Sequence, residues 1–207
     1  MGKLKVFATI IVMVLSFESF SQLTSDKQEI PVYFPQISSG NFKSTEVLDS
    51  FLNKWYSEQL FALKEPILFT QQNNNIIVYR LTVLRTFANP YTIRVENSNN
   101  EITLFWKECD GSGGYEPGNL IKDKKTKLRN EDWEQIEKYI DKIDFWDLPI
   151  EDTNYSPPED GTAGLIEAVK NRKYHITTYW DPMKVNISKL FHFLVSKTDI
   201  NYKEQRD

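Results

Sequence analysis

The chain has 207 residues, of which 25 are basic and 29 acidic, so its formal net charge is −4 at neutral pH. Such a mildly acidic chain lacks the cationic surface that nucleic acid binding requires, and we expect no nucleic acid partner. The single cysteine, Cys109, excludes an intrachain disulfide framework, so the fold must be held together by its apolar core.

The first 21 residues have the three parts of a secretory signal peptide. Lys3 and Lys5 give a positive start, Val6–Phe17 is an apolar run of twelve residues, and Ser19 and Ser21 have the spacing of a cleavage site. Twelve apolar residues fall short of the roughly 20 that span a bilayer, so we expect cleavage and no stable membrane span. The sequence therefore predicts a secreted or periplasmic protein, with residues 1–21 as its signal peptide.

The first half of the expected mature chain contains one predicted helix and three predicted strands. After a polar lead-in over residues 22–43, Ser44 or Thr45 can cap a helix that ends before Pro66. Its apolar residues recur at helical spacing, and they are Val47, Leu48, Phe51, Leu52, Trp55 and Tyr56. The strands are predicted over Ile76–Phe87, Tyr91–Glu96 and Glu101–Glu108, the last two joined by a hairpin turn.

The second half begins with a glycine-rich loop and a lysine-rich connector, Lys122–Arg129. Asn130 caps a second helix, in which Trp133 is predicted to be buried, and Trp146 beyond it is assigned to the core as well. Residues 152–164 are predicted to form a loop. The remaining predicted elements are a hairpin of Leu165–Val169 and Tyr174–Trp180 and a third helix, Val185–Val195.

This order of elements predicts one α+β domain over residues 44–199, followed by a polar tail over residues 200–207. We expect a mostly antiparallel sheet of about five strands, built from hairpins and packed with about three helices on one face. Strand–helix–strand alternation is missing from the sequence, so a dinucleotide-binding fold is not expected.

The glycine-rich loop lies within the stretch FWKECDGSGGYEPG, residues 105–118. Its spacing matches neither a phosphate-binding loop nor a calcium loop, and we predict no metal ligand and no cofactor. The sequence places no histidine beside Cys109, so this cysteine is interpreted as a small buried hydrophobe. The four glycines indicate a loop whose backbone has an unusual shape.

A second group of polar residues comprises Asp160, Glu167, His175 and Asp181, and Asp110 is added to the first three in the hydrolase alternative. If the second hairpin turns at Asn171-Arg172, Glu167 lies opposite Ile176 and His175 opposite Ala168, which puts the two on opposite faces. A register shift of one residue would bring them to the same face. We favour the interpretation that Glu167 pairs with an arginine or a tyrosine hydroxyl.

Several motifs of the second half resemble those of a group of uncharacterised, often exported bacterial proteins. They are Gly113-Gly114-Tyr115-Glu116-Pro117-Gly118, Trp133, Phe145-Trp146-Asp147-Leu148-Pro149, Asp160-Gly161, Glu167, Tyr174-His175 and Trp180-Asp181-Pro182. The likeness covers about residues 105–195, and Gly164 stands where the group has a tryptophan. The resemblance implies that these elements belong to one domain, and it implies no particular activity, substrate or cofactor.

The predicted function is that of a non-catalytic binding module for a peptide, a glycan or an envelope protein, because loops on a rigid scaffold usually carry the contacts. The predicted binding residues are Tyr115, Glu116, Tyr155, Asp160, Glu167, His175 and Trp180. Trp180 stands at the end of a strand, and the sequence leaves two alternatives for it, burial in the core or contact with a ligand. Two alternatives are a hydrolase that uses Glu167, His175 and Asp160, and a structural component of the envelope.

Overall fold

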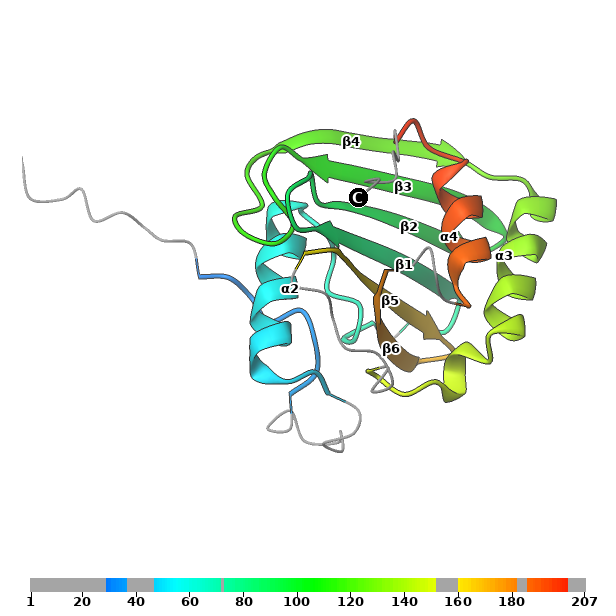
Figure 1. The fold of residues 1–207 in the computed structure, drawn as a ribbon. Helices are drawn as coiled ribbons and strands as arrows, with labels where there is room; N and C mark the ends of the chain where they lie inside the picture. Colours follow the sequence, from blue (N-terminus) through cyan, green and yellow to red (C-terminus); the bar gives the residue numbers. More distant parts are fainter. Residues whose placement is uncertain (1–28, 37–46, 72, 152–159, 182–185, 201–207) are drawn as a thin grey trace, which may run out of the picture.

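The computed structural model describes residues 29–36, 47–71, 73–151, 160–181 and 186–200. They form a six-stranded antiparallel sheet in the order β4-β3-β2-β1-β5-β6, with three α-helices (Figure 1). The strands are β1 (Ile76–Arg85), β2 (Tyr91–Ser98), β3 (Glu101–Cys109), β4 (Leu120–Lys127), β5 (Thr162–Lys170) and β6 (Lys173–Trp180). The helices are α2 (Ser50–Ala62), α3 (Asn130–Lys142) and α4 (Ser188–Val195), with a short 3-10 helix η3 (Phe145–Asp147). The predicted α+β class is confirmed, and the predicted signal peptide lies outside the described residues.

The sheet has one strand more than expected, because the predicted connector Lys122–Arg129 contributes most of β4. This strand lies at the edge of the sheet and is largely exposed, so its sequence needs no alternation of apolar and polar residues. Lysines on an edge strand also discourage pairing with other chains. The lysine-rich composition, which suggested a connecting loop, is therefore explained by a strand that lies at the solvent-exposed edge of the sheet.

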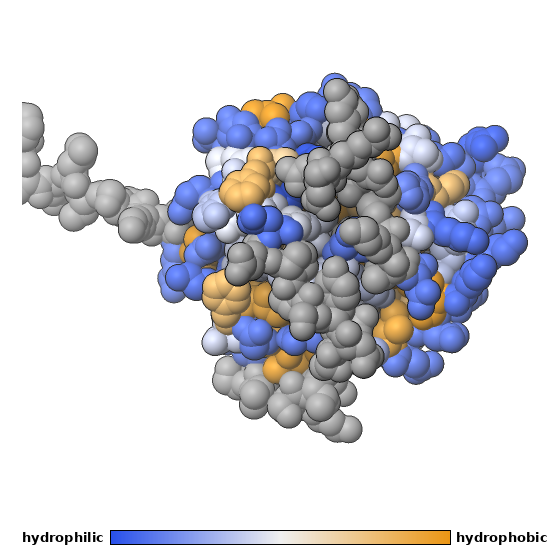
Figure 2. Space-filling view, viewed as in Figure 1, coloured by the Kyte–Doolittle hydropathy of each residue, from blue (hydrophilic) through white to orange (hydrophobic). Residues whose placement is uncertain are grey.

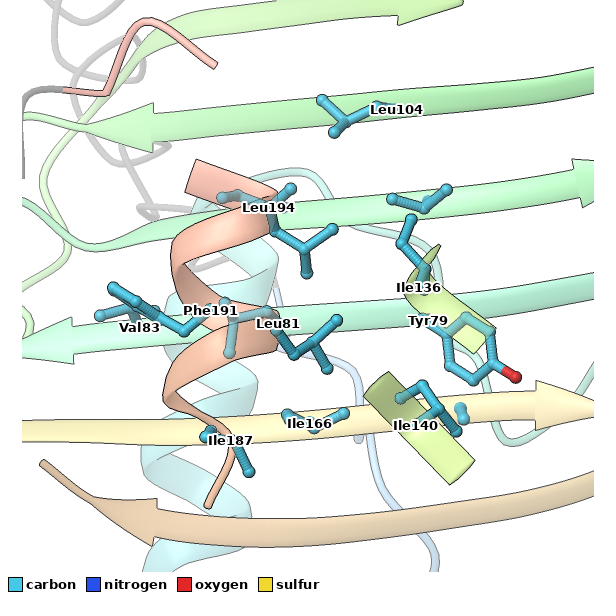
Figure 3. Packing of buried hydrophobic residues seen from close by; sticks show 14 of the residues in the cluster. Tyr79, Leu81, Val83, Leu104, Ile136, Ile140, Ile166, Ile187, Phe191 and Leu194 are labelled. Atoms are coloured by element: carbon cyan, nitrogen blue, oxygen red, sulfur yellow. The ribbon is translucent and has the colours of Figure 1, made fainter. Parts of the chain in front are cut away.

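One face of the sheet packs against α3 and α4. Tyr79, Leu81 and Val83 alternate along β1 toward this face, where they lie with residues of both helices such as Ile136 and Phe191 (Figure 3). All five are at most 3% exposed. The cluster on this face is the largest of the three apolar clusters among the described residues.

The other face packs against α2, so the sheet is covered on both faces and the expectation of one covered face is wrong. Tyr56 and Leu60 of α2 lie against Leu84, Leu165 and Ile176 of the sheet. Tyr33 and Phe34 of the lead-in join the same cluster and are buried. Tyr33 and Phe34 therefore belong to the core, whereas Ile30 and Val32 of the same segment are each 41% exposed.

Helix α2 begins later than predicted, since Asp49 caps it in place of Ser44 or Thr45. The Asp49 carboxylate accepts hydrogen bonds from the amides of Phe51 and Leu52, at 2.7 and 2.9 Å. At its other end Lys64 has a positive φ of 51°, and the amide of Glu65 donates to the carbonyl of Leu60 at 3.0 Å. This helix-ending turn directs Glu65 back toward the sheet.

The hairpins have the two-residue turns that asparagine favours. Asn99 and Asn100 have φ values of 51° and 65°, and Asn171 and Arg172 have φ values of 53° and 61°. The second turn pairs Glu167 with Ile176 and Ala168 with His175, so the predicted register is confirmed. Among the described helices, none has both the length and the apolar character needed to cross a bilayer.

Candidate functional site

The glycine loop, residues 110–119, connects β3 to β4 and folds tightly on itself. The amide of Gly111 donates to the carbonyl of Pro117 at 3.0 Å, and that of Ser112 donates to Glu116 at 2.9 Å. A Cβ on Gly111 would lie 2.2 Å from the Glu116 carbonyl oxygen, and Gly118 has a φ of 73°. Other residue types do not fit these positions, which agrees with the interpretation of the glycines as backbone-shaping residues.

The tip of this loop is fastened to the rest of the fold on two sides. The amide of Gly113 donates to the carbonyl of Ala88 at 3.0 Å, in the turn between β1 and β2. From α2, the Trp55 indole donates to the Gly113 carbonyl at 3.0 Å, and the Gln59 amide donates to the Tyr115 carbonyl at 3.0 Å. The loop is therefore held in one position by backbone and side-chain hydrogen bonds.

Four aromatic side chains are connected to this anchored tip, through the Trp55 hydrogen bond or through Tyr115 of the loop itself, and we call Phe51, Trp55, Phe87 and Tyr115 the aromatic rim. Phe51 is 71% exposed, Phe87 60% and Tyr115 62%. The rings form two pairs, with centroids 6.2 Å apart for Phe51 and Trp55 and 6.1 Å apart for Phe87 and Tyr115. On the face shown in Figure 2, the described residues are mostly hydrophilic, with small hydrophobic patches between them.

The second predicted loop reaches the same end of the sheet. The Thr86 amide and hydroxyl donate to the Gly161 carbonyl at 3.0 and 3.1 Å, and the Gly161 amide donates to the Thr86 hydroxyl at 3.0 Å. The amide of Gly114 donates to the carbonyl of Thr86 at 3.3 Å. Tyr115, Glu116 and Asp160 are thus exposed at one end of the sheet, and Tyr155 lies outside the described residues.

Glu167 lies at a different place, fully buried beneath the α2 layer. Its Oε2 atom accepts hydrogen bonds from both Nε and Nη2 of Arg80, with Nε at 2.7 Å. Its Oε1 atom accepts from the Tyr174 hydroxyl at 2.9 Å. The prediction that Glu167 pairs with an arginine or a tyrosine hydroxyl is confirmed, with both partners present.

Arg80 connects Glu167 to a larger buried charge cluster, which also contains Glu65, Arg94 and Lys107. Glu65 lies 2.8 Å from Nε of Arg94, 3.3 Å from Nζ of Lys107 and 3.5 Å from Nη1 of Arg80. Carbonyl groups complete the cluster, because Arg80 donates to Pro66 at 2.7 Å and Lys107 donates to Lys64 at 2.6 Å. The cluster fastens the segment after α2 to strands β1, β2 and β3.

The two carboxyl groups of the cluster have pKa values that are shifted in opposite directions. Burial raises the pKa of Glu167, although Arg80 and Tyr174 oppose this shift. Burial also disfavours the charged form of Glu65, but Arg80, Arg94 and Lys107 outweigh it and hold the pKa of Glu65 below its usual value. A buried carboxylate with three cationic neighbours is tied into the fold, so we assign the cluster to stability rather than to ligand contact.

Sequence reasoning did not find Glu65, Arg80, Arg94 or Lys107. A sequence signal for the two arginines was nevertheless present in β1 and β2. In each strand an arginine interrupts a run of mostly apolar or β-branched residues, at a position where the alternation of side chains along a strand points it into the protein. Their partner Glu65 comes from a distant turn, and no local pattern connects it to the strands.

His175 lies on the face of the sheet opposite Glu167, opposite Ala168 in the register. Its ring packs against Phe145 and Trp146, with centroids 4.9 and 6.2 Å away. Because Asp160 and Asp110 are exposed on loops, the described residues do not bring the proposed hydrolase group together. Trp180 is half-buried at the end of β6 and packs with the α2 layer. Trp133 and Trp146, which the sequence assigned to the core, pack against it but are only partly buried.

The burial of His175 predicts a pH-dependent stability. Burial, with Lys173 nearby, lowers the pKa of His175 below 6.5. Because the pKa of His175 is lower in the folded than in the unfolded chain, neutral His175 contributes its full stability at pH values above the unfolded-state pKa. This contribution is lost as the pH falls toward the folded-state pKa. We expect the free energy of unfolding to fall between about pH 7 and pH 5, and His175→Gln to flatten this slope, as measured by urea denaturation. His192→Gln, at an exposed position of α4, controls for the removal of a histidine, and an unchanged slope in His175→Gln would contradict the assignment.

Cys109 is fully buried at the end of β3, as the sequence suggested. Burial, followed by the charges of Asp110 and Glu108, raises the pKa of its thiol to about 11. The thiol is therefore protonated at neutral pH and a poor nucleophile. We expect alkylation of the native chain to be on the order of 100-fold slower than that of the urea-denatured chain, as followed by mass spectrometry. Equal rates would show that the thiol is exposed and activated.

The described residues contain no group of three or more His, Cys, Asp or Glu side chains that could hold a metal ion. No protein-family model and no curated protein sequence matches the chain. The interpretation of the aromatic rim consequently depends on its own geometry.

Proposed function

We propose that this protein is an exported, non-catalytic binding module that recognises a protein or peptide partner through the aromatic rim. The observation that carries the proposal is the exposure of Phe51, Phe87 and Tyr115 around a loop that hydrogen bonds hold in place. Clustered exposed aromatic rings are typical of protein interaction sites, because a few such side chains supply most of the binding energy there.

The chemistry of the rings favours an apolar protein surface as the partner. Phe51 and Phe87 carry no polar atom, so they gain free energy only by leaving water, by about 1.5–3 kcal/mol for each fully buried side chain. Tyr115 adds a hydroxyl that can bond to the edge of the same contact. Glu116 and Asp160 supply charge beside the rings, as is usual for the polar border of an interface.

The scaffold also keeps the entropic cost of binding low. The hydrogen bonds from Trp55 and Gln59 to the glycine loop fix the backbone that carries Tyr115. A contact surface that is already ordered loses less conformational freedom when the partner arrives.

Affinity capture from the cell envelope tests this proposal. The purified protein is compared with a Phe87→Ser/Tyr115→Ser double variant, and captured proteins are identified by mass spectrometry. The matched control is Ile121→Ser on β4, which removes another exposed apolar side chain, one that is 50% exposed. We expect a partner that the wild type and Ile121→Ser capture equally and that the double variant loses. Equal capture by all three proteins would refute the assignment of the aromatic rim.

A further inference from the structure

A second concave surface lies on the opposite layer, between α3, the start of β1 and the end of β5. This groove has a volume of about 770 Å³, and Ile77 and Trp133 provide apolar walls. The Trp133 ring lies 5.6 Å from the ring of Tyr79, with the two planes tilted by 34°. The groove is thus lined by one partly buried indole ring.

The floor of the groove carries an ordered polar group. The Glu137 carboxylate accepts a hydrogen bond from the Tyr79 hydroxyl at 2.8 Å and another from Nζ of Lys170 at 2.6 Å. In Figure 3 the Tyr79 hydroxyl points away from the apolar core, beside α3. Because both carboxylate oxygens are bonded, Glu137 is held in one orientation beside the indole.

The exposed border of the groove alternates in charge. Glu134 and Asp141 supply carboxylates, and Lys138 and Lys142 supply ammonium groups. Together with the ion pair on the floor, the lining has as many carboxylates as ammonium groups. A ligand with a net charge would therefore meet as much repulsion as attraction, whereas a neutral ligand that both donates and accepts hydrogen bonds can use every group.

We propose that this groove binds a neutral saccharide. A sugar ring presents a face of C–H groups that can lie on the Trp133 indole, and its hydroxyls at the ring edge can donate to the carboxylates and accept from the lysines. The groove lies on the α3 layer, whereas the aromatic rim lies at the loop end beside α2, so this proposal is independent of the one above.

Saturation-transfer NMR with three neutral hexasaccharides, maltohexaose, cellohexaose and chitohexaose, tests the proposal on the purified protein. We expect at least one of them to bind with a dissociation constant on the order of 1 mM or lower. An anionic hexasaccharide of galacturonic acid and a cationic one of glucosamine are expected to bind more weakly.

Two variants locate the binding site. Trp133→Leu is expected to weaken binding about tenfold, because it removes the ring on which the sugar lies. Glu134→Arg places a bulky cation at an exposed position of the groove, and it is also expected to weaken binding. Glu131→Arg makes the same exchange on the same helix outside the groove and should leave binding unchanged.

Three outcomes would overturn the proposal. They are the absence of binding by every neutral hexasaccharide at about 10 mM, tighter binding of a charged one, or binding that Glu134→Arg leaves unchanged. The capture experiment on Phe87 and Tyr115 is unaffected by any of them.

Discussion

Replacing Arg80 with methionine is expected to lower the free energy of unfolding by about 3–5 kcal/mol, the largest effect of any single substitution considered. Arg80 is fully buried and bonds to Glu167, Glu65 and the Pro66 carbonyl. Methionine fills similar space but leaves the Glu167 carboxyl group buried with the Tyr174 hydroxyl as its remaining hydrogen-bond partner. Urea denaturation followed by circular dichroism measures the change.

Two further variants separate the effect of burial from that of charge. Lys127→Met removes the exposed ion pair with Glu101 and is expected to leave the denaturation midpoint unchanged. Arg80→Met/Glu167→Leu removes both buried partners and should recover part of the lost stability, because no uncompensated carboxyl group remains at position 167. An Arg80→Met protein as stable as the wild type would show that the charge cluster contributes nothing to the fold.

Replacing Gly113 with valine is expected to displace the glycine loop and to destabilise the protein by about 3 kcal/mol. A Cβ at this position would lie 2.6 Å from the amide nitrogen of Arg85 and 2.7 Å from Cα of Leu84. These atoms belong to the β1 backbone, which cannot move aside without breaking its pairing. The bonds from Trp55 and Gln59 to the loop should be lost as well, so near-ultraviolet circular dichroism should report a changed aromatic environment.

Tyr115→Ala is the matched comparison within the same loop. It removes an exposed ring and leaves the backbone bonds of the loop intact, so partner capture should fall while the denaturation midpoint stays the same. If Gly113→Val kept both wild-type stability and capture, the close packing of the loop on β1 would not be needed for the site.

Local turn chemistry made part of this fold predictable from the sequence. Asn171-Arg172 set the register of the second hairpin, and that register separated Glu167 from His175 as predicted. The glycines of the loop likewise indicated a special backbone shape, because positive φ and close backbone approach exclude other residues. Such inferences depend on residues near one another in the chain.

Features that depend on distant contacts were not predictable. The ion pairs of Glu65 reach strands far along the chain, and the coverage of the second face depends on how α2 folds back. Phe51 shows the limit of helical periodicity, because it belongs to the apolar stripe of α2 and yet is 71% exposed. Periodicity identifies an apolar face, but the width of its buried part depends on the sheet beneath it.

Photo-crosslinking in living cells is the most direct test of the aromatic rim as a contact surface. A benzoyl-phenylalanine side chain is introduced in place of Tyr115, which is exposed in the rim, or in place of Ile121 on β4 as the comparison. The account predicts a discrete protein adduct from position 115 that position 121 does not give. No adduct at position 115, or the same adducts from both positions, would contradict it.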